Sequence, residues 1–468
     1  MSSGRLNAIG RHVVLVGFMG AGKTTFGREA ATRLGREFLD LDRAIEQRAG
    51  KSIPELFEER GEAEFRRIEE HAARVALASP EPGVISLGGG AVTSAATREL
   101  LTNAFVVLVD VDVTAAWDRV KRSKRPLARD EGEFRRLFAA RSPLYQELAD
   151  AAAPDTAAIV LAAAGIHYER GALDRLGELV PGSGPVALVA DSTVMGIHGA
   201  RAQEALGARL TTTHELPAGE EAKDVTIVSR LWRELRLDRG GTVVALGGGC
   251  TTDVAGFAAA TYLRGVPWVP VPTTLVGQVD AAIGGKTGID IPEGKNLVGA
   301  FHWPALVVLD ETLLETLPDR ERRQGMAELI KTQLLAGRKL DVRTAAAYKA
   351  GVCLQDPHDN GPRRYLNLGH TFAHGLEAAA DFDLPHGEAV ALGLLAALRL
   401  SGRDTSEVER ELAPQPAHVD PERAWAALLR DKKRTGDAIN LVLLGEKGPY
   451  VEARPADEVR RELERLIA

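Results

Sequence analysis

A glycine-rich loop between an apolar run and a helical stretch is the strongest constraint that this sequence places on its fold. The run at 12–16 leads into GFMGAGKT at 17–24, which has the spacing GxxxxGK[ST]. Glycines let backbone N–H groups point at phosphate oxygens, the lysine can reach the β- and γ-phosphates, and the threonine hydroxyl can bind Mg²⁺. A chance glycine-rich turn would not place the strand, the lysine and the threonine in this order. The candidate residues for MgATP are Gly17, Gly20, Ala21, Gly22, Lys23, Thr24 and Thr25.

The length of the chain calls for more than one domain. Its 468 residues suggest two or three domains of roughly 100–200 residues each. The formal net charge of -7 provides no overall positive field to attract nucleic acid. Cys250 and Cys353 form no CxxC pair, no signal peptide is evident, and no apolar run approaches the ~20 residues of a membrane span. We therefore expect a cytoplasmic protein that acts on small molecules and binds neither nucleic acid nor membranes.

Apolar runs alternate with amphipathic stretches in the first two thirds of the chain, which is typical of α/β domains. Buried strands are predicted at 12–17, 83–87, 106–109, 186–190, 242–246 and 268–271. After Pro318 the strand signals fade, and helices are predicted at 321–336, 364–380 and 387–401. We place a join near residue 163. The expected domains are 1–162 and 163–468, the second with an α/β part (163–315) and a mostly helical part (316–468).

Three further features of the first domain indicate which molecule accepts the phosphate. Asp40 and Asp42 occupy alternate positions of a predicted extended segment, so both carboxylates would lie on one face. Arg66, in EFRRIE, could form a two-pronged contact with a carboxylate. The glycines at 88–90 follow a predicted strand and would allow close approach to a ligand. Each signal is weak alone.

In this order, these features closely resemble the shikimate kinase family over about residues 11–156. The resemblance implies that Lys23 is catalytic, that Thr24 and Asp40 bind Mg²⁺, and that Arg125 of KRPL belongs to a lid over the reacting phosphates. The implied shikimate-binding residues are Asp42, Arg66, Gly88, Gly89, Gly90 and Arg141. No closing helix is evident after Thr156, so we expect a trimmed domain or one that borrows contacts from the second.

The second half opens on a weaker glycine signal. A predicted strand leads into Gly247-Gly-Gly249, with Asp253 six residues after Gly247, which is compatible with a dinucleotide site. Lysines and an asparagine near the next glycine turns suit an anionic ligand, although ordinary surface turns could look the same. The polar residues of this segment are Thr273, Thr274, Asp280, Lys286, Lys295 and Asn296.

Three histidines point to a metal. His370 and His374 lie one helical turn apart, His386 precedes another predicted helix, and Glu328 lies on a third. One carboxylate and two imidazoles would hold a catalytic Zn²⁺ and leave room for substrate or water. Spacing alone leaves open which two of the three histidines bind the metal.

The second half closely resembles the 3-dehydroquinate synthase family from about residue 166 to the C-terminus. The resemblance implies Zn²⁺ or Co²⁺ bound by Glu328, His370 and His386, with His374 beside it as a catalytic residue on the phosphate side. It implies NAD⁺ binding by Asp191, Glu220, Lys223, Gly248, Gly249, Asp253, Thr273 and Thr274. It implies substrate binding by Asp280, Lys286, Lys295, Asn296, Lys331, Lys349, Arg363, Asn367 and Lys432, among which Lys286 and Lys331 are catalytic. Arg264 of YLRG would reach the phosphate bound by a second copy, which implies a homodimer through this half.

The reaction that this resemblance implies is the cyclisation of 3-deoxy-arabino-heptulosonate 7-phosphate to 3-dehydroquinate, with release of phosphate. NAD⁺ removes a hydride and returns it in the same turnover, which leaves metal and cations to stabilise the charges of substrate and intermediates. The sequence departs from the family in two places. Lys331 and Lys349 are only 18 positions apart, where a longer helical insert is expected, and Asp359 stands where we expect glutamate.

Rival functions remain open for the second half. Another sugar-phosphate cyclase would make an inositol-like or valiolone-like product, but Asn367 and His374, like the fused kinase, favour dehydroquinate synthesis. A glycerol-dehydrogenase-like enzyme would leave Lys286 and Arg363 with no phosphate or carboxylate to bind. The non-enzyme alternative is a regulatory module, against which stands the intact set of ligands. The two resemblances together predict a bifunctional enzyme of the shikimate pathway, which serves aromatic amino acid biosynthesis.

Overall fold

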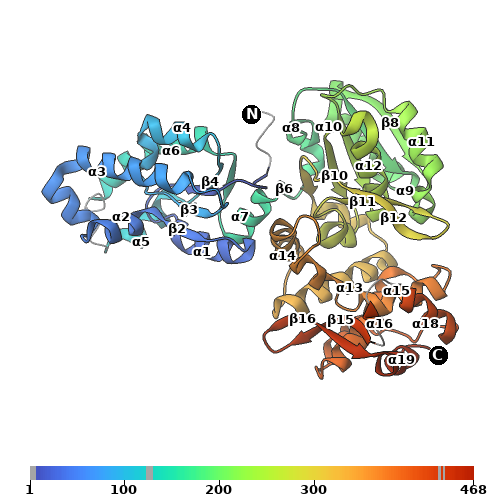
Figure 1. Ribbon diagram of the computed structural model, residues 1–468. Coiled ribbons are helices and arrows are strands. Elements are labelled where there is room, and N and C mark those ends of the chain that lie inside the picture. Colours follow the sequence, from blue (N-terminus) through green and yellow to red (C-terminus); the bar gives the residue numbers. More distant parts are fainter. Residues whose placement is uncertain (1–6, 123–129, 431–433, 436–437) are drawn as a thin grey trace. The chain divides into compact units, whose positions relative to one another are not determined.

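The computed structural model describes residues 7–122, 130–430, 434–435 and 438–468. The chain divides into two compact units, Met1–His167 and Tyr168–Ala468 (Figure 1). The first predicted domain ends at residue 162, five residues before this division. Among the described residues, no helix is long and apolar enough to cross a lipid bilayer.

The first unit is a five-stranded parallel sheet in the order β2-β3-β1-β4-β5, with helices packed around it (Figure 1). The strand β1 lies at its centre because VVLV is apolar at every position, so both of its faces can be buried. The strands are β1 (Val13–Val16), β2 (Phe38–Asp40), β3 (Val84–Ser86), β4 (Phe105–Val109) and β5 (Ala151–Ala153), and β6 (Ile166–Tyr168) follows at the division. The helices are α1 (Lys23–Leu34), α2 (Leu41–Ala49), α3 (Ile53–Leu77), η1 (Ala91–Thr93), α4 (Ala95–Leu101), α5 (Val113–Val120), α6 (Glu131–Leu148) and α7 (Thr156–Ala163).

A closing helix does follow Thr156, so our expectation of none was wrong. The helix α7 begins after Asp155, whose side chain accepts a hydrogen bond from Ala158 N at 2.9 Å. Its sequence TAAIVLAA is apolar all round, so it carries no amphipathic period, and the helix is buried against α1. Thr156 Oγ1 also donates to Glu29 Oε2 at 2.8 Å. The first unit therefore completes its core with its own helix.

The second unit begins with a four-stranded parallel sheet in the order β10-β9-β7-β8. This arrangement confirms the predicted α/β part. The strands are β7 (Val186–Asp191), β8 (Leu210–Leu216), β9 (Thr242–Gly247), β10 (Trp268–Pro272), the hairpin of β11 (Lys286–Ile291) and β12 (Gly294–Phe301), and β13 (Val307–Leu309). The helices and turns are η2 (Ala172–Arg175), α8 (Leu176–Leu179), α9 (Ser192–Val194), η3 (Met195–Gly199), α10 (Ala200–Leu206), η4 (Gly207–Arg209), η5 (Gly219–Lys223), α11 (Val225–Glu234), α12 (Gly249–Thr261), η6 (Tyr262–Arg264), η7 (Gly277–Ala281) and η8 (Glu311–Thr316).

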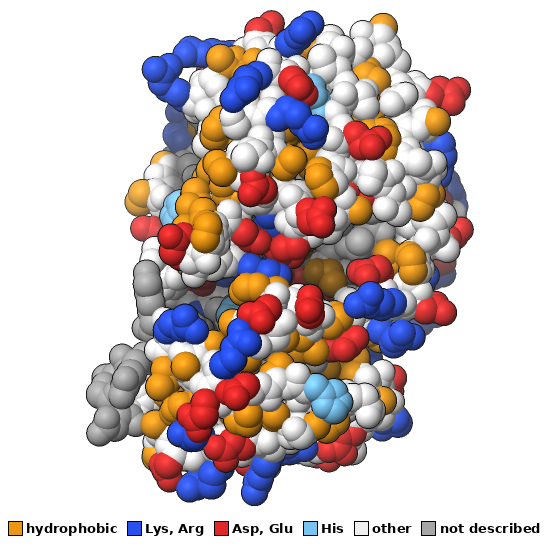
Figure 2. All heavy atoms as spheres, turned by 90° about the vertical axis from the view of Figure 1, so that its right-hand side faces the viewer, with side chains coloured by type: hydrophobic (Ala, Val, Ile, Leu, Met, Phe, Trp, Pro, Cys, Tyr) orange, Lys and Arg blue, Asp and Glu red, His pale blue; other side chains and the backbone are white. Residues whose placement is uncertain are grey.

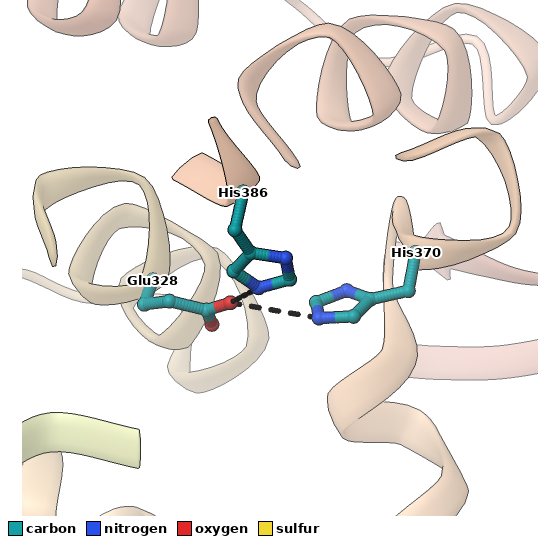
Figure 3. A group of neighbouring side chains, drawn as sticks. All are labelled: Glu328, His370 and His386. Carbon is teal, nitrogen blue, oxygen red and sulfur yellow. Dashed lines mark hydrogen bonds and ion pairs between the residues drawn. The ribbon is translucent and has the colours of Figure 1, made fainter. Parts of the chain in front are cut away.

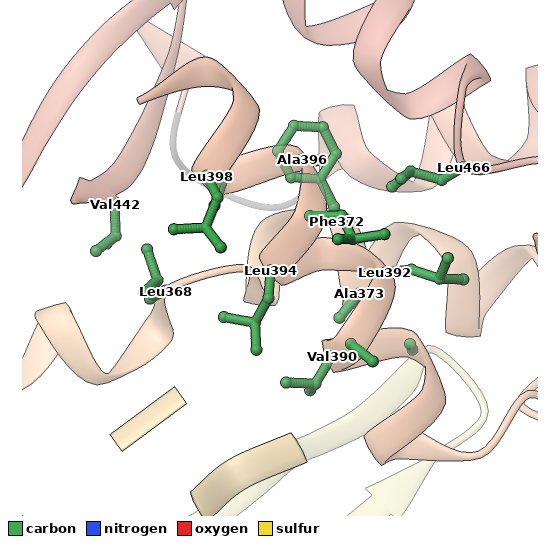
Figure 4. Close-up of a cluster of buried hydrophobic side chains, with 14 of the residues drawn as sticks. Leu368, Phe372, Ala373, Val390, Leu392, Leu394, Ala396, Leu398, Val442 and Leu466 are labelled. Carbon is green, nitrogen blue, oxygen red and sulfur yellow. The ribbon is translucent and has the colours of Figure 1, made fainter. Parts of the chain in front are cut away.

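The remainder of the second unit is mostly helical and is organised around α16. Side chains of α15 and α16, among them Phe372, Leu394 and Leu398, pack in one buried cluster (Figure 4). Gly369 has a φ of +81°, and a Cβ atom on Gly393 would lie 2.1 Å from the carbonyl oxygen of Gly369. The two segments therefore touch backbone to backbone. The helices are α13 (Asp319–Ala336), α14 (Val342–Gln355), η9 (Pro362–Asn367), α15 (His370–Ala379), α16 (His386–Leu400), α17 (Ser406–Leu412), α18 (Pro421–Arg430) and α19 (Ala456–Glu464).

The part after Pro318 is mostly helical, as expected, but three strands in it were missed. They are β14 (Arg434–Thr435), β15 (Ala438–Gly445) and β16 (Gly448–Pro455), which form an antiparallel sheet. A signal was present, because the apolar run INLVLL is followed by a turn at Gly448 and by the alternating segment YVEAR. The sheet adds Ile439, Leu441 and Leu443 to the core of the helical part.

Candidate active sites

The phosphate loop of the first unit is shaped by residues that cannot carry side chains. Gly17, Gly20 and Gly22 have φ values of +141°, +85° and +98°, and a Cβ atom on Gly17 would lie 2.6 Å from the carbonyl oxygen of Val109. Lys23 opens α1, and its Nζ donates to the carbonyl oxygens of Gly17 at 2.7 Å and Phe18 at 3.1 Å. The loop thus folds around the lysine ammonium. Of the remaining predicted loop residues, Ala21 is buried and Thr25 is exposed.

Asp40 and Asp42 lie on different elements, so the prediction of one extended segment was wrong. Asp40 ends β2 and caps α2, where its Oδ1 accepts from Arg43 N at 3.3 Å. Asp42 therefore lies in the first turn of a helix, because aspartate is a favoured N-cap residue. Thr24 Oγ1 donates to Asp40 Oδ2 at 2.6 Å. The structure joins these two predicted Mg²⁺ ligands and turns Asp42 toward Gly88, where a Cβ atom would lie 2.6 Å from Asp42 Oδ1.

The predicted shikimate-binding residues meet around the glycines at 88–90. A Cβ atom on Gly90 would lie 2.3 Å from Arg66 Nη1, so only glycine leaves room for this guanidinium. Arg141 Nη1 donates to the carbonyl oxygen of Gly89 at 3.3 Å. Asp42, Arg66 and Arg141 thus gather around the glycine backbone at 88–90. Arg125, the predicted lid residue, lies outside the described residues.

Sequence reasoning missed two residues of this cluster, Glu69 and Tyr145. Glu69 is 3% exposed and accepts from Arg66 Nη1 at 2.6 Å. Burial raises the pKa of Glu69, and the Arg66 guanidinium opposes this. Tyr145 donates its hydroxyl hydrogen to the carbonyl oxygen of Gly89 at 2.5 Å. Glu69 could have been found, because it lies three residues after Arg66 on the same helical face.

In the second unit, the predicted NAD⁺ residues gather where the parallel strands of the large sheet end. Asp191 ends β7, where its Oδ2 accepts from Thr251 Oγ1 at 3.1 Å. Gly248 and Gly249 begin α12 directly after β9, and a Cβ atom on Gly248 would lie 3.1 Å from Thr274 Cγ2. Thr273 N donates to the carbonyl oxygen of Gly247 at 3.0 Å. Ligands of open α/β sheets bind at this carboxyl edge.

A buried lysine links the NAD⁺ residues to residues that we assigned to the substrate. Lys223 Nζ is 2.9 Å from Asp253 Oδ2 and 3.7 Å from Glu220 Oε1, and it also donates to Asn296 Oδ1. Burial alone would lower the pKa of Lys223, but Asp253 and Glu220 raise it above its usual value. Lys295 Nζ lies 3.4 Å from Glu220 Oε2. Lys295 and Asn296, which we predicted to bind substrate, therefore lie among the residues predicted to bind NAD⁺.

A second charged cluster joins the α/β part to the helical part. Asp280 lies in η7, a single π-helical turn, and its Oδ1 is 2.6 Å from Lys349 Nζ and 3.5 Å from Lys331 Nζ. Lys331 also pairs with Glu328 on the same helix, α13. Burial alone would raise the pKa of Asp280, but the two lysines hold it below its usual value. Lys349 thus reaches the site despite the short connection after α13.

The other predicted substrate residues are only partly brought together. Lys286 pairs with Asp359 and lies 6.0 Å from the centre of the Phe301 ring, and the guanidinium of Arg363 lies 5.8 Å from the same ring. Asn367 ends η9, three residues before His370. Arg264 is exposed in η6 and, within the part of the chain that the structure describes, joins none of these clusters. Lys432 lies outside the described residues.

The metal cluster draws one side chain from each of three helices. Glu328 of α13, His370 of α15 and His386 of α16 point toward one another, with their ligand atoms all within 4.8 Å (Figure 3). Glu328 Oε1 lies 3.1 Å from His386 Nε2 and 3.5 Å from His370 Nε2. Donors at about 2.0–2.2 Å from a tetrahedral ion lie about 3.3–3.6 Å from one another. The donor set and its spacing therefore fit Zn²⁺ or a similar ion.

The two histidines of this cluster have pKa values shifted in opposite directions. Burial, with the positive charge of Lys331, lowers the pKa of His370 to about 4. Burial alone would also lower the pKa of His386, but the flanking carboxylates of Glu328 and Glu377 raise it to about 10. The His386 side chain is 42% exposed, so water screens part of this effect. His374 lies beside the cluster, with its ring centre 5.5 Å from that of His370.

A hollow separates the α/β part from the helical part of the second unit. Figure 2 shows acidic and basic side chains gathered along a hollow between the α/β part and the helical part. Asp280 of the α/β part meets Lys331 and Lys349 of the helical part, so residues of both parts share the site. The chain therefore contains two sites of different chemical character, one in each unit. The first unit is built for phosphoryl transfer, and the second for metal-assisted chemistry beside a dinucleotide-type sheet.

Comparisons with known proteins give the family. The sequence model of the shikimate kinase family matches residues 19–163. The models of 3-dehydroquinate synthase, N-terminal and C-terminal, match residues 213–324 and 338–434. The bifunctional shikimate kinase/3-dehydroquinate synthase of Thermotoga maritima is 32% identical and aligns with 95% of this chain and 98% of its own length. The chain belongs to this bifunctional family and is an enzyme with both activities.

Two further relatives concern the second unit. The 3-dehydroquinate synthase of Symbiobacterium thermophilum is 41% identical over 61% of this chain and 92% of its own length. A solved structure of 2-deoxy-scyllo-inosose synthase, complexed with carbaglucose-6-phosphate, NAD⁺ and Co²⁺, matches 64% of this chain and 96% of its own with a TM-score of 0.59 and 25% identity. The family models favour dehydroquinate synthesis over the rival cyclases and the regulatory module.

Proposed function

We propose that the first unit transfers the γ-phosphate of MgATP to the 3-hydroxyl of shikimate, with the roles that follow. The main supporting observation is that Arg66 faces the glycine backbone at 88–90, which lies beside Gly17 and Met19 of the phosphate loop. When ATP binds, the Lys23 ammonium donates to phosphate oxygens in place of the loop carbonyl oxygens. Thr24 and Asp40 bind Mg²⁺. Asp42 accepts a hydrogen bond from the reacting hydroxyl, while Arg66 and Arg141 bind the shikimate carboxylate.

Arg66→Ala should raise the KM for shikimate about 10- to 100-fold, because a hydrogen bond to a charged group is lost. The KM for ATP should change less than twofold. Initial rates of ADP release, measured over both substrates, separate the two constants. Arg67→Ala is the matched control, since Arg67 is the next residue but is 77% exposed and pairs with Glu64. Equal effects of Arg66→Ala on both substrates would mean that the shikimate site is wrongly assigned.

We propose that the second unit uses NAD⁺ and Zn²⁺, or Co²⁺, to convert 3-deoxy-arabino-heptulosonate 7-phosphate to 3-dehydroquinate and phosphate. When bound, the metal would polarise the substrate alcohol and NAD⁺ would accept and return its hydride. Glu328, His370 and His386 would hold the metal, and the residues at the carboxyl edge of the large sheet would hold NAD⁺. Support comes from the donor spacing and from the NAD⁺ and Co²⁺ in the similar synthase structure.

The charged residues of the hollow would then bind and orient the substrate. Lys331 and Lys349 are buried, and both pair with Asp280. An oxyanion of the substrate bound there would meet two positive charges held in fixed positions. Lys286 and Arg363, around the Phe301 ring, suit the phosphate or carboxylate of the substrate. Two free cysteines agree with a cytoplasmic location, which is part of the proposal.

A strong chelator should abolish the synthase activity and spare the kinase once Mg²⁺ is restored in excess. The three donors favour Zn²⁺ or Co²⁺ over Mg²⁺, because imidazole is a poor ligand for Mg²⁺. The full-length protein is treated, freed of chelator and assayed for phosphate release from the heptulosonate phosphate and for ADP release with shikimate. Addition of Zn²⁺ or Co²⁺ should restore the first activity. Undiminished synthase activity in protein that elemental analysis finds metal-free would contradict the metal role.

Arg264 should serve the active site of a second copy in a homodimer. It is exposed and lies apart from the clusters of its own chain, and both Leu263 and Arg264 have positive φ values, 51° and 68°. Such strain in non-glycine residues is typical of functional turns. Sedimentation velocity should give a dimer, and Arg264→Ala and His370→Ala should each inactivate the synthase. Exchange of subunits between the two variants should restore about one quarter of the activity, because half the dimers then hold one intact site. No recovery in mixed dimers would place Arg264 in its own site.

A further inference from the structure

The two histidines of the metal cluster are held by different groups. His370 Nδ1 lies 3.2 Å from the carbonyl oxygen of Leu368, a backbone atom two residues earlier. His386 Nδ1 lies 3.0 Å from Glu377 Oε1. Glu377 is 7% exposed and lies on α15, seven residues, or about two helical turns, after His370. One helix therefore supplies a metal ligand and also the carboxylate that holds the other imidazole ligand.

The contact with Glu377 determines which nitrogen of His386 faces the metal position. A carboxylate can only accept, so Nδ1 carries a proton toward Glu377. Nε2 is the nitrogen that faces Glu328, 3.1 Å away, where a bound metal would replace its contact with that carboxylate. His386 is the first residue of α16 and its side chain is 42% exposed, so packing alone leaves the ring free to turn. Its backbone is fixed separately, because Gln324 Oε1 accepts from Gly387 N at 2.6 Å. Two carboxylates thus set the direction of the ring, and Glu377 is the one that still holds the imidazole once Glu328 binds a metal.

We propose that Glu377 is a positioning residue that orients His386 and strengthens its bond to the metal. The proposal rests on the proposed role of Glu328, His370 and His386 as metal ligands. A carboxylate bound to the far nitrogen of a ligand imidazole fixes the tautomer and makes the ring a stronger donor, and its loss costs about 10- to 100-fold in metal affinity. Sequence reasoning missed Glu377, although it lies on the same face of α15 as His370.

Metal affinity of the full-length protein is the direct test. Zn²⁺ and Co²⁺ affinities are measured by competition with a chromophoric chelator for the wild type, Glu377→Gln and Glu377→Ala. Glu377→Ala should bind about 10- to 100-fold more weakly. Glu377→Gln keeps the size and an acceptor oxygen but not the charge, so its loss should be smaller. Glu462→Gln is the matched control, since Glu462 is also buried on a helix of this unit and pairs with Arg465 instead. Its affinity should stay within twofold of the wild type.

A second measurement separates positioning from general stability. The visible absorption of bound Co²⁺ reports its ligands, so Glu377→Ala should alter the spectrum, whereas lower stability alone would leave it unchanged. The inference is overturned if Glu377→Ala binds within twofold of the wild type with the same spectrum, or if Glu462→Gln loses as much affinity. A wild-type protein that binds neither ion would instead contradict the proposed metal function itself.

Discussion

Lys23→Met is expected to lower the kcat of the kinase about 100- to 1,000-fold, the cost of removing one preorganised donor that stabilises developing charge. In the structure Lys23 Nζ lies at the centre of the phosphate loop, bound to the carbonyl oxygens of Gly17 and Phe18. Methionine has a similar length but provides no charge and no hydrogen-bond donor. Synthase activity should remain within twofold of the wild type, because Lys23 belongs to the first of two compact units. Both activities are assayed on one preparation, as ADP release with shikimate and as phosphate release from the heptulosonate phosphate.

Lys51→Met is the control for Lys23→Met. Lys51 belongs to the same unit, but it pairs with Glu59 at the surface and lies outside the loop. Both activities of this variant should stay within twofold of the wild type. If Lys23→Met instead slowed the synthase more than tenfold, or about 1.4 kcal/mol of barrier, the two sites would not be independent.

His370→Ala should abolish the synthase, with a loss of about 1,000-fold or more, and leave the kinase unchanged. It removes one of the three proposed metal ligands, and metal stabilisation of a developing alkoxide contributes several kcal/mol. It also removes one partner of the buried Glu328, whose Oε1 lies 3.5 Å from His370 Nε2. Elemental analysis of the purified variant should show little bound metal.

His198→Ala is the matched control for His370→Ala. His198 is also a buried histidine of the second unit, but its Nε2 lies 2.9 Å from Thr316 Oγ1, apart from the metal cluster. This variant should retain its metal. Full metal content in His370→Ala would show that His370 is not a ligand.

Site residues that follow one another in a local motif could be predicted from the sequence. Contacts between residues that are far apart in the sequence could not. The phosphate loop was predictable because strand, glycines, lysine and threonine follow one another in sequence. The predicted trio of Glu328, His370 and His386 meets in the structure, although spacing alone left open which two of the three histidines bind a metal. The contact of Asn296 with Lys223 joins residues 73 positions apart, so no local sequence pattern predicts it.

Errors in the fold had physical causes of the same kind. The helix α7 carries no amphipathic period because it is buried on all sides. Asp42 was misplaced because the capping role of Asp40 turns strand into helix between the two carboxylates. The β15–β16 hairpin did carry its signal, an apolar run and an alternating run about a turn, and could have been predicted.

The backbone contact of Gly369 with Gly393 shows which parts of the helical region tolerate sequence change and which do not. His370 follows one of these glycines, and His386 starts the helix that carries the other, so helix packing sets the spacing between the two imidazoles. The outer connection at 338–341 can shorten, since α14 still delivers Lys349 to Asp280. A lineage could thus delete whole turns at the periphery and keep its chemistry, whereas one added methyl group on Gly393 would force the two helices apart.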